Sequence, residues 1–202
     1  WRMYSERAHA GCTGGDGCPS RSFTDLNTGV WYHPYTDYVI SHSLMRGLSS
    51  TLFAPNQSMT RGMMVTTLYR LAGEPQVEGT ATFQDVKSSA YYANAVAWAE
   101  ANGIAKGIDT GVFAPNAPVT REQAAAFAYR YVTAYLGKTP VPGASLGGFQ
   151  DAGLVSDYAA ESLSWAHAAG LMVGYGDGFL GPKDTVTRAQ MAKLLTLLAQ
   201  NF

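Results

Sequence analysis

The chain has 202 residues, of which 47% are hydrophobic, and a formal net charge of −1. This near-neutral balance argues against a nucleic-acid partner, because phosphate binding needs a clustered excess of Lys and Arg. No apolar run approaches the roughly 18 residues of a membrane span, so membrane insertion is not expected. The chain opens at Trp1 rather than Met, and we interpret it as a fragment or a processed piece of a larger protein.

The lead-in segment, residues 1–22, contains both cysteines in the stretch GCTGGDGCPS. In a secreted protein, the close spacing of Cys12 and Cys18 favours a small disulfide-closed loop. Two free thiols in a flexible segment are the alternative. A metal site formed by His9 and both cysteines would lack a fourth ligand, so no metal is expected here.

Three similar segments follow the lead-in, and we divide the chain into repeats at 23–73, 83–137 and 149–202. They begin with FTDLNTGVWY, FQDVKSSAYY and FQDAGLVSDY, each of which has an aromatic residue nine positions after the Phe. They continue with LFAPNQSMTR, VFAPNAPVTR and FLGPKDTVTR, and the distance from Phe to the closing Thr is 37, 37 and 38 residues. Agreement in order and spacing predicts a repeated supersecondary unit.

Each repeat is predicted to form a helix, a compact loop and a second helix, so the fold class is all-α. Gly103 is placed to end the first helix of repeat 2, and Thr120 with Gln123 forms a capping box for the second helix. Thr187 with Gln190 repeats the box, whereas repeat 1 has only the Thr. The second helices carry apolar stripes, which we expect to be buried against one another.

The repeat resembles the S-layer homology domain. The pattern of that family runs Phe-x-Asp-Val, Trp-Ala, Gly-Ile-x-x-Gly-x-x-Asp-Gly-x-Phe-x-Pro and Ile-Thr-Arg-Ala-Glu. The stretches GIAKGIDTGVFAPNAPVTREQ and GLMVGYGDGFLGPKDTVTRAQ follow it closely. The resemblance covers about residues 23–202.

The resemblance implies a fold and a function. Tandem triplets of the family form a pseudo-threefold body, with a central bundle of helices and grooves between neighbouring repeats. They hold secreted proteins at the bacterial cell surface by binding cell-wall polysaccharide, in several members a pyruvylated N-acetylmannosamine end group. We therefore expect a non-catalytic cell-wall anchoring module.

The arginine of each Thr-Arg sequence is the main candidate for ligand binding: Arg121, Arg188 and Arg61. The family implicates this residue in holding the anionic sugar. A helix N-terminus attracts anions, and a guanidinium adds a planar fork for a carboxylate. We expect exposed first turns, so that substitution by Ala leaves folding intact. The alternative is an ion pair with a nearby carboxylate, of Asp25, Asp85 or Asp151, although caps of the first helices are the expected role of these Asp residues.

Glycines and tyrosines complete the candidate site. Gly47, Gly107 and Gly174 are interpreted as turn residues with positive φ, and as points where a sugar ring could approach the backbone. Tyr92 and Tyr158 are candidates for stacking on a sugar, although aromatic residues at helical spacing, including Trp98 and Trp165, usually belong to the core.

Two other functions were weighed against wall-polysaccharide binding. The first is a self-assembly or protein–protein scaffold, for which surface-layer proteins would be the partners, and the second is binding to peptidoglycan itself. Enzymatic activity is not expected, because Glu100, Glu122 and Glu161 fall singly in separate repeats and no nucleophile motif is present. No phosphate loop is present either, so no cofactor is expected. Repeat 1 lacks the Asp-Gly pair of the loop, and a pocket built on it should be altered.

Overall fold

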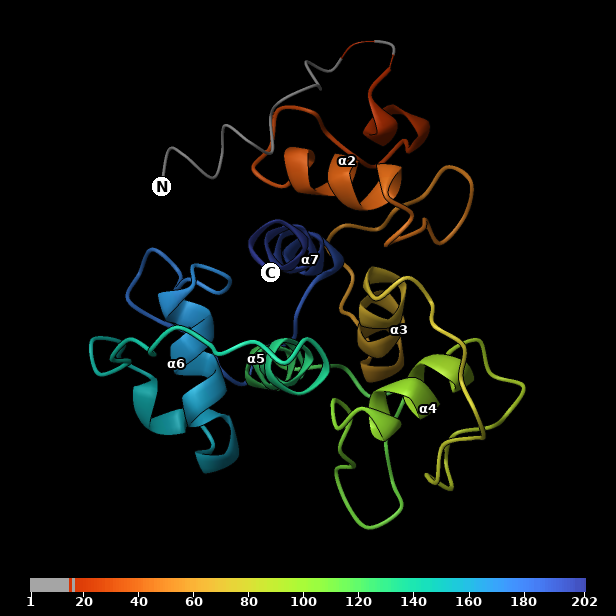
Figure 1. The fold of residues 1–202 in the computed structure, drawn as a ribbon. Helices are drawn as coiled ribbons and strands as arrows, with labels where there is room; N and C mark the ends of the chain where they lie inside the picture. The colour runs from red at the N-terminus through yellow and green to blue at the C-terminus, as the bar shows by residue number, and fades with distance from the viewer. Residues whose placement is uncertain (1–14, 16) are drawn as a thin grey trace. The chain divides into compact units, whose positions relative to one another are not determined.

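The structure is a computed structural model that describes residue 15 and residues 17–202. This part of the chain forms six α-helices (Figure 1): α2 (His33–Ser41), α3 (Arg61–Leu71), α4 (Ala93–Ala101), α5 (Arg121–Arg130), α6 (Ala160–Ala168) and α7 (Arg188–Asn201). Short 3-10 turns occur at η1 (Pro19–Ser22), η3 (Ala152–Leu154) and η4 (Asp157–Ala159), and a π-helical turn, η2 (Tyr131–Tyr135), continues α5. Isolated bridges are the only β-structure in these residues, so the predicted mainly helical class is confirmed.

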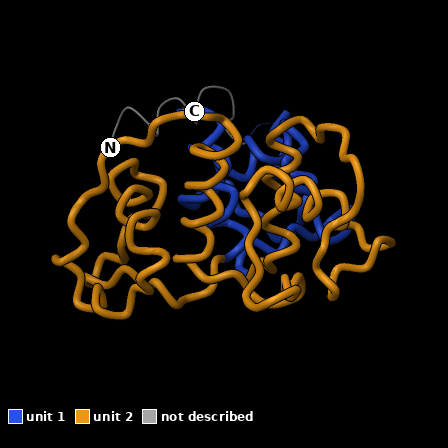
Figure 2. Tube along the Cα trace, turned by 60° about the horizontal axis from the view of Figure 1, so that its bottom comes forward, with its two compact units in different colours: residues 1–57, 187–201 blue, residues 58–186, 202 orange. Residues whose placement is uncertain are grey.

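The chain folds as two compact units (Figure 2). Unit 1 contains the described residues up to 57 together with residues 187–201, and unit 2 contains residues 58–186 and 202. In unit 1, α2 packs on α7, and in unit 2, α3 packs on α4 and α5 packs on α6. The second helix of each repeat therefore packs on the first helix of the following repeat, and the last repeat returns to the first. The predicted pseudo-threefold arrangement around a central bundle stays a prediction.

The second helices of the three repeats, α3, α5 and α7, are called the long helices here, and they begin where the capping chemistry predicts. Thr120 Oγ1 accepts a hydrogen bond from Gln123 N at 3.3 Å, and Gln123 Oε1 accepts one from Thr120 N at 3.2 Å. Thr187 and Gln190 exchange the same two bonds, at 3.3 and 3.0 Å. Thr60 makes only the side-chain half of the cap. Gly103, with φ of +69°, follows the end of α4 as predicted.

The predicted apolar stripes supply the core of each unit. Trp98 and Trp165 are 3% and 1% exposed, so both belong to the core rather than to a ligand surface. Trp98 packs edge-on against Tyr135 of the π-helical turn, and Trp165 packs against Tyr129 of α5. The stripe residues that are fully buried are Met64, Val65 and Leu68 of α3, Ala124 and Phe127 of α5, and Met191, Leu194, Leu195 and Leu198 of α7.

Three residues just before the Thr-Arg sequences form a ring of backbone hydrogen bonds within unit 2. Met59 N donates to Val186 O at 2.8 Å, Val186 N donates to Val119 O at 3.0 Å, and Val119 N donates to Met59 O at 2.9 Å. All three side chains are at most 2% exposed. Because each repeat gives one donor and one acceptor, these buried groups are all satisfied.

The structure bears on the predicted disulfide of the lead-in segment and on the expectation that the chain does not insert into a membrane. The predicted Cys12–Cys18 disulfide involves Cys12, which lies outside the described residues, whereas Cys18 is buried beside α2. Within the described part of the chain, no helix has the length and apolar character needed to cross a bilayer.

Candidate ligand-binding site

The arginines of the three Thr-Arg sequences are buried. Arg61, Arg121 and Arg188 are 4%, 6% and 5% exposed, so the prediction of exposed first turns is wrong. The reason is that each long helix begins directly against the loop of the following repeat. Sequence reasoning considered only the helix to which the arginine belongs, and the covering loop lies in another repeat.

Arg61 illustrates the geometry. Its Nε donates to Phe113 O at 2.7 Å, and its Nη2 donates to Lys106 O at 3.0 Å. The guanidinium carbon lies 4.7 Å from the centre of the Phe113 ring and 5.3 Å from that of Phe127. One planar group therefore fixes two backbone carbonyls of the following repeat while it packs on aromatic faces.

Arg121 and Arg188 form the same two bonds in their own surroundings. Arg121 Nε and Nη2 donate to Leu180 O at 2.9 Å and Val173 O at 2.7 Å, and Arg188 Nε and Nη2 donate to Phe53 O at 2.7 Å and Arg46 O at 2.6 Å. Arg188 packs on the Phe53 ring at 4.7 Å. In repeat 3 a Leu stands where the other loops have Phe, and Arg121 packs instead on Tyr175, at 4.9 Å.

The positive charges of Arg61 and Arg121 are not neutralised by ion pairs within the described residues. Burial lowers the pKa of both guanidinium groups, although nearby Tyr175, Asp184 and Asp151 act in the opposite direction at Arg121. The hydrogen-bond partners of each guanidinium are neutral carbonyls. The alternative of a direct ion pair with the aspartates at the repeat starts is therefore wrong for these two arginines.

These aspartates hold the loops instead, and the prediction that they cap the first helices is wrong. Asp85 accepts hydrogen bonds from Phe113 N at 2.9 Å and Ala114 N at 2.6 Å. Asp25 binds residues 53 and 54 in the same way, and Asp151 binds residues 180 and 181. The loop residue is thus fixed on both sides, because the aspartate binds its N–H and the arginine binds its carbonyl.

The N-termini of the long helices have no open N–H groups for an anion, contrary to the sequence argument. Arg121 N donates to Asp184 O at 2.9 Å and Glu122 N to Pro182 O at 3.0 Å, while the N–H of the third residue binds the capping Thr. The starts of α3 and α7 are satisfied in the same manner. A ligand at this junction would have to be bound by side chains.

The three candidate glycines lie beside the arginines, each from the following repeat. Arg61 binds the carbonyl just before Gly107, Arg121 the one before Gly174, and Arg188 the one before Gly47. None of the three glycines has positive φ, so that interpretation is wrong. Space requires them instead: a Cβ at residue 174 would lie 2.3 Å from Phe149 Cε1, and one at residue 107 would lie 2.7 Å from two backbone oxygens.

The two candidate tyrosines occupy equivalent places but differ in exposure. Tyr92 is 9% exposed and packs against the start of α3 at Gly62. Tyr158 is 55% exposed, and its hydroxyl donates to Glu122 Oε1 at 3.3 Å at the start of α5. Burial raises the pKa of Tyr158, and the charge of Glu122 adds to this effect, while Arg61 and Arg130 lower it. Tyr158 is thus an exposed aromatic side chain close enough to Arg61 and Arg130 to be affected by their charges.

A polar network around Glu122 was not foreseen from the sequence. Glu122 Oε1 lies 2.6 Å from Lys183 Nζ and accepts from Ser156 Oγ at 2.9 Å, while Oε2 accepts from Ser156 N at 3.0 Å. Burial acts to raise the pKa of Glu122, but the hydrogen bonds from Lys183 and Ser156 outweigh it, and the net pKa is lowered. The sequence shows that Glu122 is an acidic residue in the first turn of α5, but its partners Ser156 and Lys183 lie 34 and 61 residues further along the chain.

Comparison with known proteins agrees with this repeated geometry. The sequence model of the S-layer homology domain matches residues 22–63, 82–125 and 148–192, which together make up more than half of the chain. The chain belongs to the S-layer homology family. Each match begins at the start of a repeat, includes the aspartate that holds the loop, and ends shortly after the arginine that begins the second helix of the same repeat.

Relatives with this segment include both surface proteins and enzymes. The chain is 33% identical to an endoglucanase of Bacillus sp. (strain KSM-635), covering 87% of this chain and 18% of the relative. It is 30% identical to the surface-layer 125 kDa protein of Lysinibacillus sphaericus (81% and 14%) and 26% identical to the S-layer protein sap of Bacillus anthracis (90% and 22%). The chain thus spans less than a quarter of each relative, and the likeness concerns a cell-surface anchoring segment rather than a catalytic domain.

Proposed function

We propose that the chain anchors a larger secreted protein to the bacterial cell wall by binding an anionic wall polysaccharide. The binding sites are the arginine junctions, the three places where Arg61, Arg121 or Arg188 at a helix start contacts the loop of another repeat. The observation that carries this proposal is the buried guanidinium of Arg61 and of Arg121, bound only to neutral carbonyls and ion-paired with no carboxylate of the described residues. Removing a cation from water is costly unless an anion compensates it. A carboxylate on the ligand would supply that compensation.

The remaining nitrogen of each guanidinium, Nη1, is the group assigned to the ligand. Nε and Nη2 are already committed to the loop carbonyls, which hold the guanidinium plane in a fixed orientation. A preorganised donor loses little entropy when it binds an anion. The resemblance to the family favours a pyruvylated N-acetylmannosamine end group, whose pyruvate carboxylate meets this requirement.

The other candidate residues are assigned supporting roles. Gly107 and Gly174 let the loop backbone lie against Phe83 and Phe149, and so hold in place the carbonyls that orient the two guanidinium groups. Tyr158 offers an exposed ring near Arg61 and Arg130, where it can stack on a sugar face. Tyr92 packs against the start of α3 at Gly62, and we assign to it the positioning of that helix start rather than direct contact. Gly47 and Arg188 would form the equivalent junction in unit 1.

The ligand class is tested with purified cell-wall sacculi before and after hydrofluoric acid removes the attached polysaccharide. We expect binding to untreated sacculi and loss of binding after stripping. Binding that survives stripping unchanged would point to peptidoglycan and overturn the proposal. Concentration-dependent self-association in analytical ultracentrifugation, together with no binding to any sacculi, would support the scaffold alternative.

The site is tested by calorimetry with isolated wall polymer. Arg121→Lys keeps the charge but loses the planar fork, and we expect binding about 10-fold weaker, equivalent to one charged hydrogen bond of roughly 1.5 kcal/mol. Lys87→Ala is the matched control, because Lys87 is an exposed cation outside the junctions. Equal affinity of Arg121→Lys, Arg188→Lys and Lys87→Ala would remove the assignment of the site.

A further inference from the structure

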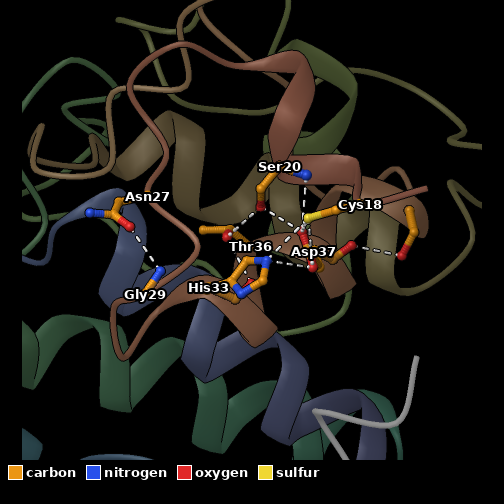
Figure 3. A network of polar contacts seen from close by, with 8 residues as sticks. Cys18, Ser20, Asn27, Gly29, His33, Thr36 and Asp37 are labelled. Carbon is orange, nitrogen blue, oxygen red and sulfur yellow. Dashed lines mark hydrogen bonds and ion pairs between the residues drawn. The ribbon is translucent and has the colours of Figure 1, made fainter. Parts of the chain in front are cut away.

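Three side chains with metal-binding chemistry meet in unit 1, between the turn η1 and helix α2 (Figure 3). Cys18 immediately precedes η1, and His33 and Asp37 lie one turn apart on α2. The three residues are buried, with exposed fractions of 6%, 5% and 7%. None of them contributes to the arginine junctions.

The three ligand atoms converge on one region. Cys18 Sγ lies 3.1 Å from His33 Nε2, His33 Nε2 lies 2.9 Å from Asp37 Oδ2, and Cys18 Sγ lies 3.5 Å from both carboxylate oxygens of Asp37. A thiol, an imidazole and a carboxylate are together the ligands that Zn²⁺ takes in proteins. In a tetrahedral zinc site such atoms would be about 3.3–3.6 Å apart, so movements of a few tenths of an ångström would admit the ion.

The geometry does not fit a catalytic relay. In such a relay the thiol and the carboxylate contact opposite nitrogens of the imidazole, and the carboxylate orients the ring. Here Cys18 and Asp37 both face Nε2 of His33. The three residues are at most 7% exposed, so a substrate has little access to the sulfur. Three donors around one point are the arrangement that a metal ion requires.

A second set of contacts orients the carboxylate. Asp37 Oδ1 accepts hydrogen bonds from Ser20 N at 2.9 Å and from Ser20 Oγ, which itself lies 3.1 Å from Thr36 Oγ1. Oδ2 is thereby turned toward His33 and Cys18 (Figure 3). Outer contacts of this kind fix the ligands of natural metal sites.

We propose that Cys18, His33 and Asp37 bind a divalent transition metal, zinc in the first place, as a structural site that fastens η1 to α2. The thiolate, Nε2 and Oδ2 supply three ligands, and water or a further donor completes the tetrahedron. This site was not predicted from the sequence, where only His9 was considered as a metal ligand beside the cysteines. The useful signal was the i, i+4 spacing of His33 and Asp37, which places both side chains on one face of a helix.

This site and the predicted disulfide exclude each other, because Cys18 cannot be a zinc thiolate and a disulfide sulfur at the same time. The test therefore uses the full chain, purified with a phosphine reductant, stripped with a chelator and reloaded with zinc. We expect about one zinc per chain after desalting. Replacement of zinc by Co²⁺ should give a thiolate-to-cobalt charge-transfer band together with the visible bands of tetrahedral cobalt.

The variants separate a metal site from a simple ion pair. Cys18→Ser should abolish the charge-transfer band, and Cys18→Ser and His33→Gln should each weaken zinc binding by at least about 100-fold, beyond the usual effect of losing an outer contact. Ser20→Ala, which removes only an outer contact, should weaken zinc binding by about 10-fold to 100-fold. His42→Gln is the matched control, since His42 is exposed at the end of the same helix, and it should change nothing.

Two outcomes would overturn the proposal. One is a reduced wild-type chain that retains no zinc and gives cobalt spectra without a thiolate band, which would identify the cluster as an ion pair and hydrogen bonds without a metal. The other is zinc affinity in Cys18→Ser equal to that of His42→Gln. The wild-type cobalt spectrum decides the question even if a variant fails to fold.

Discussion

We expect the buried guanidinium of Arg121 to stabilise the fold, and the substitution Arg121→Ala tests this through the free energy of unfolding. The substitution removes the bonds to Leu180 O at 2.9 Å and Val173 O at 2.7 Å, and it removes packing on the Tyr175 ring. Both carbonyls would lose a charged donor in a region closed to most solvent. An arginine on an exposed first turn, as expected from the sequence, could be replaced by Ala with folding left intact.

The magnitude follows from these contacts. Each hydrogen bond to a charged group contributes about 1.5–3 kcal/mol, so two bonds set an upper range of roughly 3–6 kcal/mol. Relief of the cost of burying a cation offsets part of this. We therefore expect the free energy of unfolding to fall by about 2–4 kcal/mol, and Tm to fall by about 5–15 °C for a chain of this size.

The assay is urea denaturation followed by circular dichroism, with a thermal melt beside it. Arg121→Lys keeps the charge and one donor direction, and it should lose about half as much stability as Arg121→Ala. Lys87→Ala, at an exposed position, should stay within about 0.5 kcal/mol of the wild type. If Arg121→Ala unfolds at the same urea concentration as Lys87→Ala, the structural role of the guanidinium is refuted.

Three further predictions follow from the loops and their contacts. Ala114 has φ of +56°, a backbone conformation that costs an L-residue about 1–2 kcal/mol. Ala114→Gly should therefore raise the free energy of unfolding by about 0.5–1 kcal/mol in urea denaturation, and a loss of stability would contradict this. Gly174→Ala places a Cβ 2.3 Å from Phe149 Cε1 and should cost about 1–3 kcal/mol, whereas an unchanged Tm would show that the ring moves freely. The lowered pKa of Glu122, whose carboxylate binds Lys183, means that its stabilisation is present above the unfolded pKa of about 4.3 and is lost as pH falls through the lower folded value. Glu122→Gln should flatten this part of the stability-against-pH curve, and an identical curve would argue against the ion pair.

Features that depend on neighbouring residues were predictable from the sequence. The caps at Thr120 and Thr187 form as expected, because a capping box is complete within four residues of one chain segment. Pro34 lies in the first turn of α2, a position that proline fits because of its fixed φ and missing N–H. The order of helices and loops in each repeat was likewise readable, because the pattern occurs three times.

Features that depend on distant partners were not predictable. The role of Asp85 was misjudged because its hydrogen-bond partners lie 28 and 29 residues later, in the loop rather than at the adjacent helix. The burial of Arg121 was missed because the covering carbonyls lie 52 and 59 residues away, in the following repeat. A repeat pattern reports which positions are alike, but it does not report whether a side chain contacts its own repeat or the next one.

The ring formed by Met59, Val119 and Val186 limits how the array can change in length. Deleting the third repeat would leave Met59 N without an acceptor and Val119 O without a donor, both at buried positions. A two-repeat chain would then expose one complementary pair of backbone groups, as the edge of a sheet does, and we expect it to associate with a second copy. A fourth repeat could join only by breaking one of the three bonds. Closure of this ring thus needs all three repeats, because each of them supplies one backbone donor and one acceptor.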